Sequence, residues 1–246
     1  MGHLIKVTFV GLLSGMLGTG IGGMAAFFIK NASKKFLSFL IEFSAGLMTS
    51  VVCFKLLPEA FEQGGSSITF AGVFAGIVAI MILEAYIKNN DSFNKGYTDS
   101  NLLKAGILTS VGIALHNLPE GFAVGSGFEA SLDLGIALTA VIIIHDIPEG
   151  IAMAVPMRAG GFSKAKAFLL TLASGLPMGV GAFFGAVLGG ISIKFTAACL
   201  GFAAGAMLYV VYGELVPESK RLYFGRFSSI ANILGIIIGI IVSLYG

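Results

Sequence analysis

Eight long apolar stretches constrain this chain more than any other feature of its sequence. Each is long enough for the roughly 20 residues that a membrane-spanning helix needs, and they cover residues 4–29, 37–60, 67–87, 102–126, 133–157, 165–190, 194–217 and 226–245. Only 11% of the 246 residues are charged, whereas about a quarter of the residues in a soluble domain are charged. Backbone groups in lipid must be satisfied within each segment. The sequence therefore predicts an all-α integral membrane protein with eight transmembrane helices, forming a single transmembrane domain over residues 1–246.

The basic residues predict how this domain is oriented, because Lys and Arg favour the cytoplasmic side of short connections. Most of the 15 basic residues follow the first, third, fifth and seventh stretches. They are Lys30, Lys34, Lys35, Lys88, Lys95, Lys104, Arg158, Lys164, Lys166, Lys220, Arg221 and Arg226. We therefore expect both termini to lie outside the cytoplasm. The net charge of +2 is a topology signal and gives no reason to expect a nucleic-acid partner.

Two pairs of segments resemble each other within the chain. HNLPEG at 116–121 returns as HDIPEG at 145–150, and IEFSAGLMTSVVCFKLLPEA at 41–60 aligns with LGFAAGAMLYVVYGELVPES at 200–219 when Pro58 is placed over Pro217. In the expected topology the members of each pair run in opposite directions. The chain then reads as three helices, a central pair and three helices again, with inverted repeats. Secondary transporters show this pattern and bind their substrates where the repeats meet.

The central pair carries the chemistry. His116 and Glu120 are four residues apart, as are His145 and Glu149, so each pair projects from one face of a helix. Ionisable side chains at membrane depth are costly, and by default they mark an ion path or a substrate site. Imidazole and carboxylate together suit a divalent transition metal, zinc especially. The sequence therefore predicts a metal site near the middle of the membrane.

The prolines inside the two motifs are expected to distort the helices beside this site. Pro119 and Pro148 each lack the backbone donor for the carbonyl four residues earlier. These carbonyls belong to Leu115 and Ile144, directly before the histidines, and they could serve a cation or water.

The duplicated motifs on the fourth and fifth of eight helices resemble the ZIP (Zrt-, Irt-like) metal transporters over essentially the whole chain. The resemblance implies a transport site made of His116, Glu120, His145 and Glu149, with Met48 as a softer ligand. It also implies a homodimer in the cell (plasma or inner) membrane. The transported substrate would be Zn²⁺, with Cd²⁺, Fe²⁺ and Mn²⁺ left open, and no bound cofactor is expected.

The chain departs from this family at a second metal position. Many members build it from residues matching Asn117, Asp146 and the two glutamates, with a further glutamate on the sixth helix, where SGLPMGVGA at 174–182 has Met178. Lys55 lies seven residues after Met48, and a lysine at that depth needs a carboxylate partner or must lose its proton.

We therefore expect Lys55 to lie near Glu120, Asp146 or Glu149, where its ammonium group would replace the second metal. Alternatively, Lys55 extends toward the outer interface. Glu214, which the repeat aligns with Lys55, is a candidate ion-pair partner or a gate.

Alternating exposure of a midplane site to the two sides of the membrane is the expected mechanism.

A different class of function, an intramembrane zinc-dependent hydrolase, stays open. It would call for an HExxH-type arrangement. Neither motif has one, because Asn117 follows His116, although Asp146 could act as a base.

Overall fold

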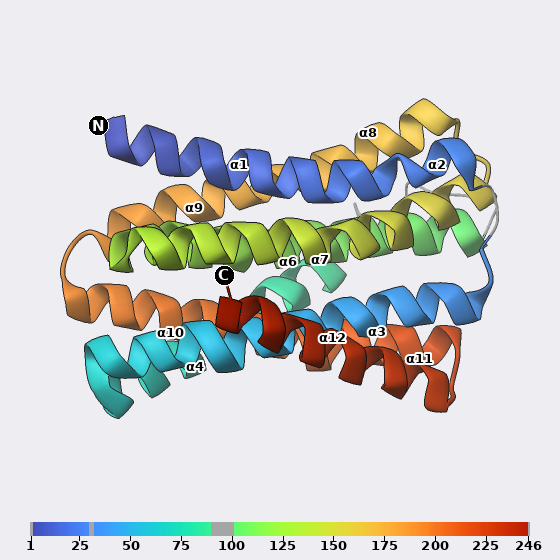
Figure 1. Ribbon diagram of the computed structural model, residues 1–246. Coiled ribbons are helices and arrows are strands. Elements are labelled where there is room, and N and C mark those ends of the chain that lie inside the picture. Colours follow the sequence, from blue (N-terminus) through green and yellow to red (C-terminus); the bar gives the residue numbers. More distant parts are fainter. Residues whose placement is uncertain (1, 30–31, 90–100, 246) are drawn as a thin grey trace.

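The computed structural model describes residues 2–29, 32–89 and 101–245, and regular structure in these ranges is helical throughout (Figure 1). Within them, the side chains at 83, 86–89, 101–109, 111, 112, 115, 116 and 242–245 lie outside the described part. In chain order the helices are α1 (Gly2–Gly23), α2 (Ala25–Phe28), α3 (Lys34–Val51), η1 (Val52–Leu56), α4 (Leu57–Asn89), α6 (Asn101–Ala130), α7 (Leu132–Ala159), α8 (Lys164–Ser174), α9 (Leu176–Gly189), α10 (Ile193–Val210), η2 (Val211–Leu215), α11 (Val216–Leu222) and α12 (Arg226–Tyr245). The segments η1 and η2 are π-helical.

Local sequence signals explain where several of these helices begin and turn. Ser33, Ser131, Ser163 and Ser192 accept a hydrogen bond from a backbone N–H in the first turn of α3, α7, α8 and α10, as N-cap residues do. Within α4 the chain turns sharply at Gly65, whose φ of 68° is a conformation that glycine adopts without steric cost. The expected helices at 37–60 and 67–87 lie on either side of this turn.

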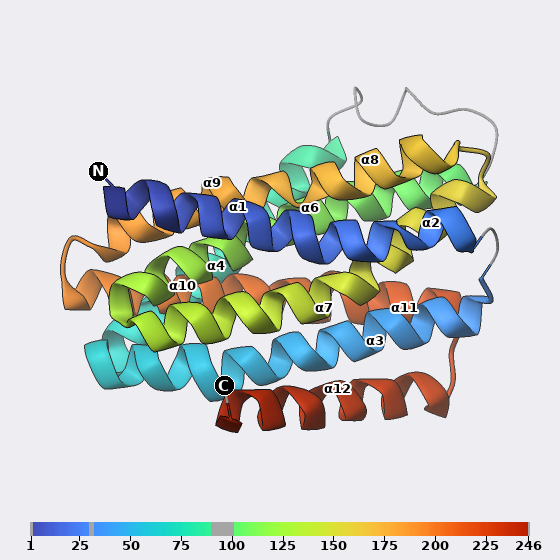
Figure 2. The same ribbon diagram turned by 45° about the horizontal axis from the view of Figure 1, so that its top comes forward.

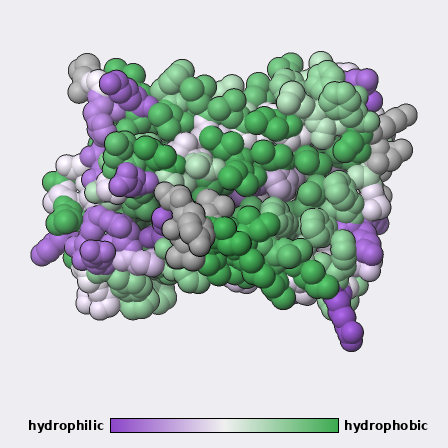
Figure 3. Space-filling view, viewed as in Figure 1, coloured by the Kyte–Doolittle hydropathy of each residue, from purple (hydrophilic) through white to green (hydrophobic). Residues whose placement is uncertain are grey.

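Apolar side chains cover much of the surface. Large hydrophobic residues are widely exposed, for example Phe74 at 66%, Leu132 at 66% and Ile237 at 47%. On the face shown in Figure 3, hydrophobic residues occupy the middle, and hydrophilic residues gather at the two ends. This distribution fits a surface that contacts lipid, since soluble monomers rarely expose large contiguous apolar patches.

Five helical stretches of the described residues are long and apolar enough to cross a membrane: Gly2–Phe28, Lys34–Ile82, Leu132–Ala159, Lys164–Gly189 and Ile193–Leu222. The second of these contains the turn at Gly65. The prediction of an all-α, multi-pass membrane protein is therefore confirmed, whereas the count of eight crossings and their 3+2+3 order stay predictions.

Packing divides the helices into two groups. The first group comprises α1, α2 and α6 to α9, with α1 packed on α7 and α6 packed on both α7 and α9. The second group comprises α3, η1, α4, α10, η2, α11 and α12, with α4 packed on α10 and α3 on α12. The groups meet mainly where α6 contacts α10 and where α3 contacts α7, which lies between α1 and α3 in Figure 2.

Glycines allow close backbone contact inside each group. A Cβ atom added at Gly121 of α6 would lie 2.0 Å from the Met178 carbonyl oxygen of α9, and one at Gly205 of α10 would lie 2.0 Å from the Val73 carbonyl oxygen of α4. Every such close contact of a described glycine joins residues of the same group. Between the groups lie larger side chains, such as the Phe122 and Phe202 rings at a centroid distance of 5.2 Å.

The two π-helical turns occupy the positions that the internal repeat aligns. Val52–Leu56 and Val211–Leu215 correspond residue for residue when Pro58 is placed over Pro217. Their buried side chains join the main apolar core, which fills the space between the groups and also contains residues of α6 and α7. The matching turns support the repeat that the sequence indicates.

Candidate metal centre

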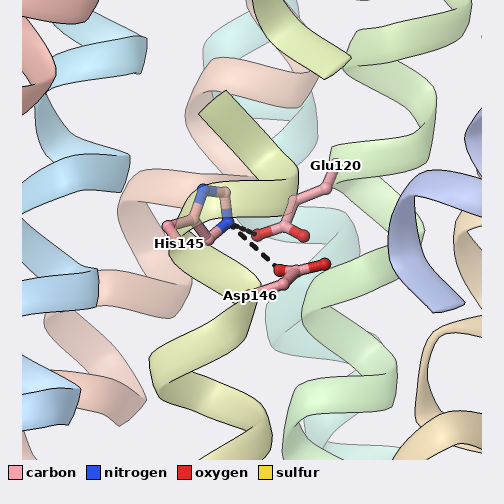
Figure 4. A group of neighbouring side chains, drawn as sticks. All are labelled: Glu120, His145 and Asp146. Atoms are coloured by element: carbon pink, nitrogen blue, oxygen red, sulfur yellow. Dashed lines mark hydrogen bonds and ion pairs between the residues drawn. The ribbon is translucent and has the colours of Figure 1, made fainter. Parts of the chain in front are cut away.

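Glu120 of α6 and His145 and Asp146 of α7 form a compact cluster in the interior (Figure 4). One ligand atom from each lies within 4.8 Å of the others, and the three side chains are fully buried. His145 Nε2 is hydrogen-bonded to Glu120 Oε1 at 2.9 Å and lies 3.4 Å from Asp146 Oδ1. Two ligand atoms on one tetrahedral zinc ion stand about 3.3 Å apart, so a small cation could be held between these atoms after slight movement.

Several polar atoms of this cluster have no hydrogen-bond partner among the described residues. They are Glu120 Oε2 and both carboxylate oxygens of Asp146, together with Asn117 Oδ1 from the preceding turn of α6. Burying a polar atom without a partner costs about 1–3 kcal/mol, and more if the group is charged. A cation bound here would satisfy these oxygens, so the donor atoms present fit a divalent metal.

Neighbouring elements position the cluster. Asn117 Nδ2 donates to the Ser174 carbonyl of α8 at 2.7 Å, which fixes the amide and leaves Oδ1 for a ligand. Gly18 of α1 lies against Asp146, where a Cβ would come within 2.4 Å of the Asp146 Cβ. Ser44 of α3 lies 2.9 Å from the His145 carbonyl oxygen and 2.9 Å from Glu149 Oε1.

Of the expected primary ligands, the structure places Glu120 and His145 together and brings Asp146, expected at a second position, into the same cluster. Glu149 is also fully buried and contacts Ser44. The side chain of His116 lies outside the described residues. Met48 is fully buried in the core between the groups, four residues after Ser44 on α3.

Met178 is the residue at which the sequence departs from the expected family pattern of a second-position glutamate. Its side chain is fully buried on α9, and its sulfur accepts a hydrogen bond from Ser14 of α1 at 3.2 Å. This side chain has no charge to offer a second cation.

The expected contact of Lys55 with the buried carboxylates is not present among the ion pairs of the described residues. Lys55 is half-buried in η1. A π-helical turn holds more residues than an α-helical turn, so a spacing of seven no longer places Lys55 on the face of Met48. Glu214 lies half-buried at the matching position of η2.

Ser44 is the residue of this site that sequence reasoning missed. A signal for it was available, because Ser44 and Met48 are four residues apart and therefore share a helix face.

Comparison with known proteins bears directly on this buried centre. A family model described as ZIP Zinc transporter matches residues 90–245, which include α6 and α7. The chain belongs to the ZIP zinc transporter family. The Zinc transporter ZupT of Akkermansia muciniphila is 34% identical over 264 residues, covering 97% of this chain and 95% of that protein. The proteins of the same name from Chlorobium limicola and Clostridium perfringens are 37% and 32% identical, over 85% and 90% of this chain and 86% and 89% of their own lengths.

Membership of the ZIP family confirms the resemblance drawn from the duplicated motifs. The relatives are named zinc transporters, and the match covers 95% and 86% of the first two. The expectation of a transporter instead of a hydrolase is therefore confirmed. In this ZIP family member the buried cluster lies within the matched region.

Asp146 provides a test of the charge in this ZIP centre. Asp146→Asn keeps the shape but removes a buried carboxyl group that lies beside the Glu120 and Glu149 carboxylates and whose two oxygens have no hydrogen-bond partner among the described residues. Uncompensated buried charge destabilises a fold, so the melting temperature of the metal-free protein in detergent should rise, by about 2–4 °C for each kcal/mol relieved in a chain of this size. Asp133→Asn, an exposed position on the same helix, is the control and should show little change. A lower melting temperature for Asp146→Asn would contradict the charge argument.

Proposed function

We propose that this chain carries divalent transition-metal cations, zinc foremost, across the membrane into the cytoplasm. The observation that carries the proposal is the fully buried cluster of Glu120, His145 and Asp146, with carboxylate oxygens that lack partners among the described residues. Such a cluster is costly inside a membrane protein unless it serves an ion. The printed name of the relatives, Zinc transporter ZupT, supports zinc as the substrate.

The proposed ligands come from both motif helices and from α3. His116, Glu120, His145 and Glu149 would bind the ion, and the Met48 thioether would add a softer ligand. Asn117 and Asp146 would contribute oxygen atoms from the adjoining positions. The absence of a carboxylate at Met178 supports a centre for one metal. Cadmium, iron and manganese are proposed as further substrates, because a mixed nitrogen and oxygen site accepts several such ions.

The division into two groups supports a carrier mechanism. Close glycine contacts hold each group together, while larger side chains lie between the groups. We propose that the first group moves relative to the second and exposes the site to each side in turn. Lys55 and Glu214, on the matched π-helical turns of the second group, would then influence the path or the gate beside the site.

The arrangement in the membrane is also proposed. Eight crossings in a 3+2+3 order with inverted repeats would place both termini outside the cytoplasm of a plasma or inner membrane. The basic residues near the expected cytoplasmic ends support this orientation, and the family resemblance supports a homodimer.

Uptake into liposomes tests the proposed function. The purified protein is reconstituted, and entry of zinc, cadmium, iron and manganese is followed side by side with a metal-sensitive dye inside. Saturable zinc entry that exceeds entry into protein-free liposomes is expected. Flux that rises without saturation would indicate a passive channel, and absence of uptake of all four ions would contradict transport.

A further inference from the structure

Ser44 makes side-chain hydrogen bonds from one helix group to the other at the metal centre. Most side-chain hydrogen bonds of the described residues join parts of the same group, such as His145 with Glu120 or Asn232 with Glu42. Ser44 belongs to α3 of the second group, whereas both of its acceptors belong to α7 of the first group. A fully buried hydroxyl therefore links the two groups directly at a proposed ligand.

This hydroxyl does not follow the usual pattern for its residue type in a helix. Serine and threonine in apolar helices commonly donate to the carbonyl of the preceding turn, as Thr49 does to Ala45 at 2.8 Å and Thr19 to Gly15 at 2.7 Å. Ser44 instead donates across the interface to the His145 carbonyl and to Glu149 Oε1, both at 2.9 Å. The His145 carbonyl lies three residues before Pro148, in the turn that the proline disturbs.

A hydroxyl has a single hydrogen, so the two acceptors share the hydrogen of Ser44 in a bifurcated hydrogen bond. Hydrogen bonds to an ionised carboxylate are roughly twice as strong as those between neutral groups. Donation to Glu149 Oε1 therefore helps to orient that carboxylate. Hydrogen bonds from residues that do not touch the metal orient the residues that bind it. Losing one such bond typically weakens metal binding about 10–100-fold.

We propose that Ser44 is a positioning residue that sets the metal affinity of the site according to the relative position of the two groups. This inference rests on the proposed function. In the arrangement described, Ser44 holds Glu149 ready for the cation. Since the hydrogen bond fails when the two atoms separate beyond about 3.5 Å, a small displacement of α7 along α3 would remove this restraint on Glu149. The site would then bind the cation more weakly, which favours release on the other side.

Serine-to-alanine variants at two positions of α3 test this proposal. Ser44→Ala should weaken zinc binding by the purified protein about tenfold and raise the KM for zinc uptake by a similar factor, with a maximal rate that is unchanged or higher. Ser50→Ala is the matched control. Ser50 is also fully buried on α3, but its hydroxyl has no hydrogen-bond partner among the described residues and lies against Gly239 of α12, within the second group. It should bind and carry zinc as the wild-type protein does.

Ser44→Thr retains a hydroxyl donor, so it should bind zinc more tightly than Ser44→Ala. Unchanged zinc affinity in Ser44→Ala, an equal loss in Ser50→Ala, or a fall in maximal rate with unchanged KM would each overturn the proposal. Binding and uptake of zinc by the wild-type protein are measured first. If the wild type shows neither, the proposed function fails, whereas a normal wild type with an unaffected Ser44→Ala rejects only the role of Ser44.

Discussion

Replacing Glu120 with glutamine should lower zinc uptake at least about 100-fold, because even outer-shell changes at metal sites cost 10–100-fold and Glu120 is a proposed direct ligand. Glutamine keeps the volume of this fully buried side chain, so packing against α7 is retained. The change removes the anionic oxygen that lies 2.9 Å from His145 Nε2. Initial rates of radiolabelled zinc uptake into proteoliposomes measure the effect, at equal amounts of folded protein.

Glu129→Gln provides the control for this loss on the same helix. Glu129 lies near the end of α6, where its Oε1 pairs with His3 Nε2 at 2.9 Å, and the His3 side chain is 63% exposed. Loss of such a surface pair costs little, so uptake should stay close to the wild-type rate. Wild-type uptake by Glu120→Gln would show that the buried cluster is not the transport site.

Gly121→Ala is expected to prevent stable folding, although it adds only a methyl group. The new Cβ would lie 2.0 Å from the Met178 carbonyl oxygen and 2.7 Å from its carbonyl carbon. On α9, Gly181 likewise lies against the Leu118 carbonyl of α6, so backbone meets backbone on both helices and neither can rotate away. Overpacking of side chains typically costs about 1–3 kcal/mol, and a backbone clash should reach or exceed the upper end of that range.

The melting temperature and the size-exclusion profile of the purified variant measure this effect. Gly213→Ala is the matched control, because its added Cβ would meet only the Tyr209 ring, at 3.4 Å, an ordinary contact distance. The control should purify like the wild type. A stable, monodisperse Gly121→Ala protein would mean that α6 and α9 are not packed as closely as described.

Much of the architecture could be read from the sequence. Apolar length predicted an all-α, multi-pass membrane protein, because the cost of an unpaired backbone group in lipid leaves few other structures. The convergence of Glu120 and His145 also followed, since two similar motifs on consecutive helices of opposite direction bring the glutamate of one motif beside the histidine of the other. Their hydrogen bond at 2.9 Å agrees with that expectation.

The contacts that the sequence could not predict depend on how packed helices are rotated relative to one another and on local departures from the regular α-helix. Ser44 looks like any small residue of an apolar helix until its direction toward His145 and Glu149 is known. The face of the helix on which Lys55 lies depends on η1, a π-helical turn that regular helical spacing does not foretell. Asn117, a possible second-position residue, is held by the Ser174 carbonyl, which no spacing rule foretells.

The number of residues in each π-helical turn determines which way the following side chains of the helix point. Each π-turn holds one residue more than the α-helix around it, so deleting one residue within Val52–Leu56 or Val211–Leu215 would restore a regular helix. Every side chain beyond the deletion would then rotate by about 100° relative to those before it.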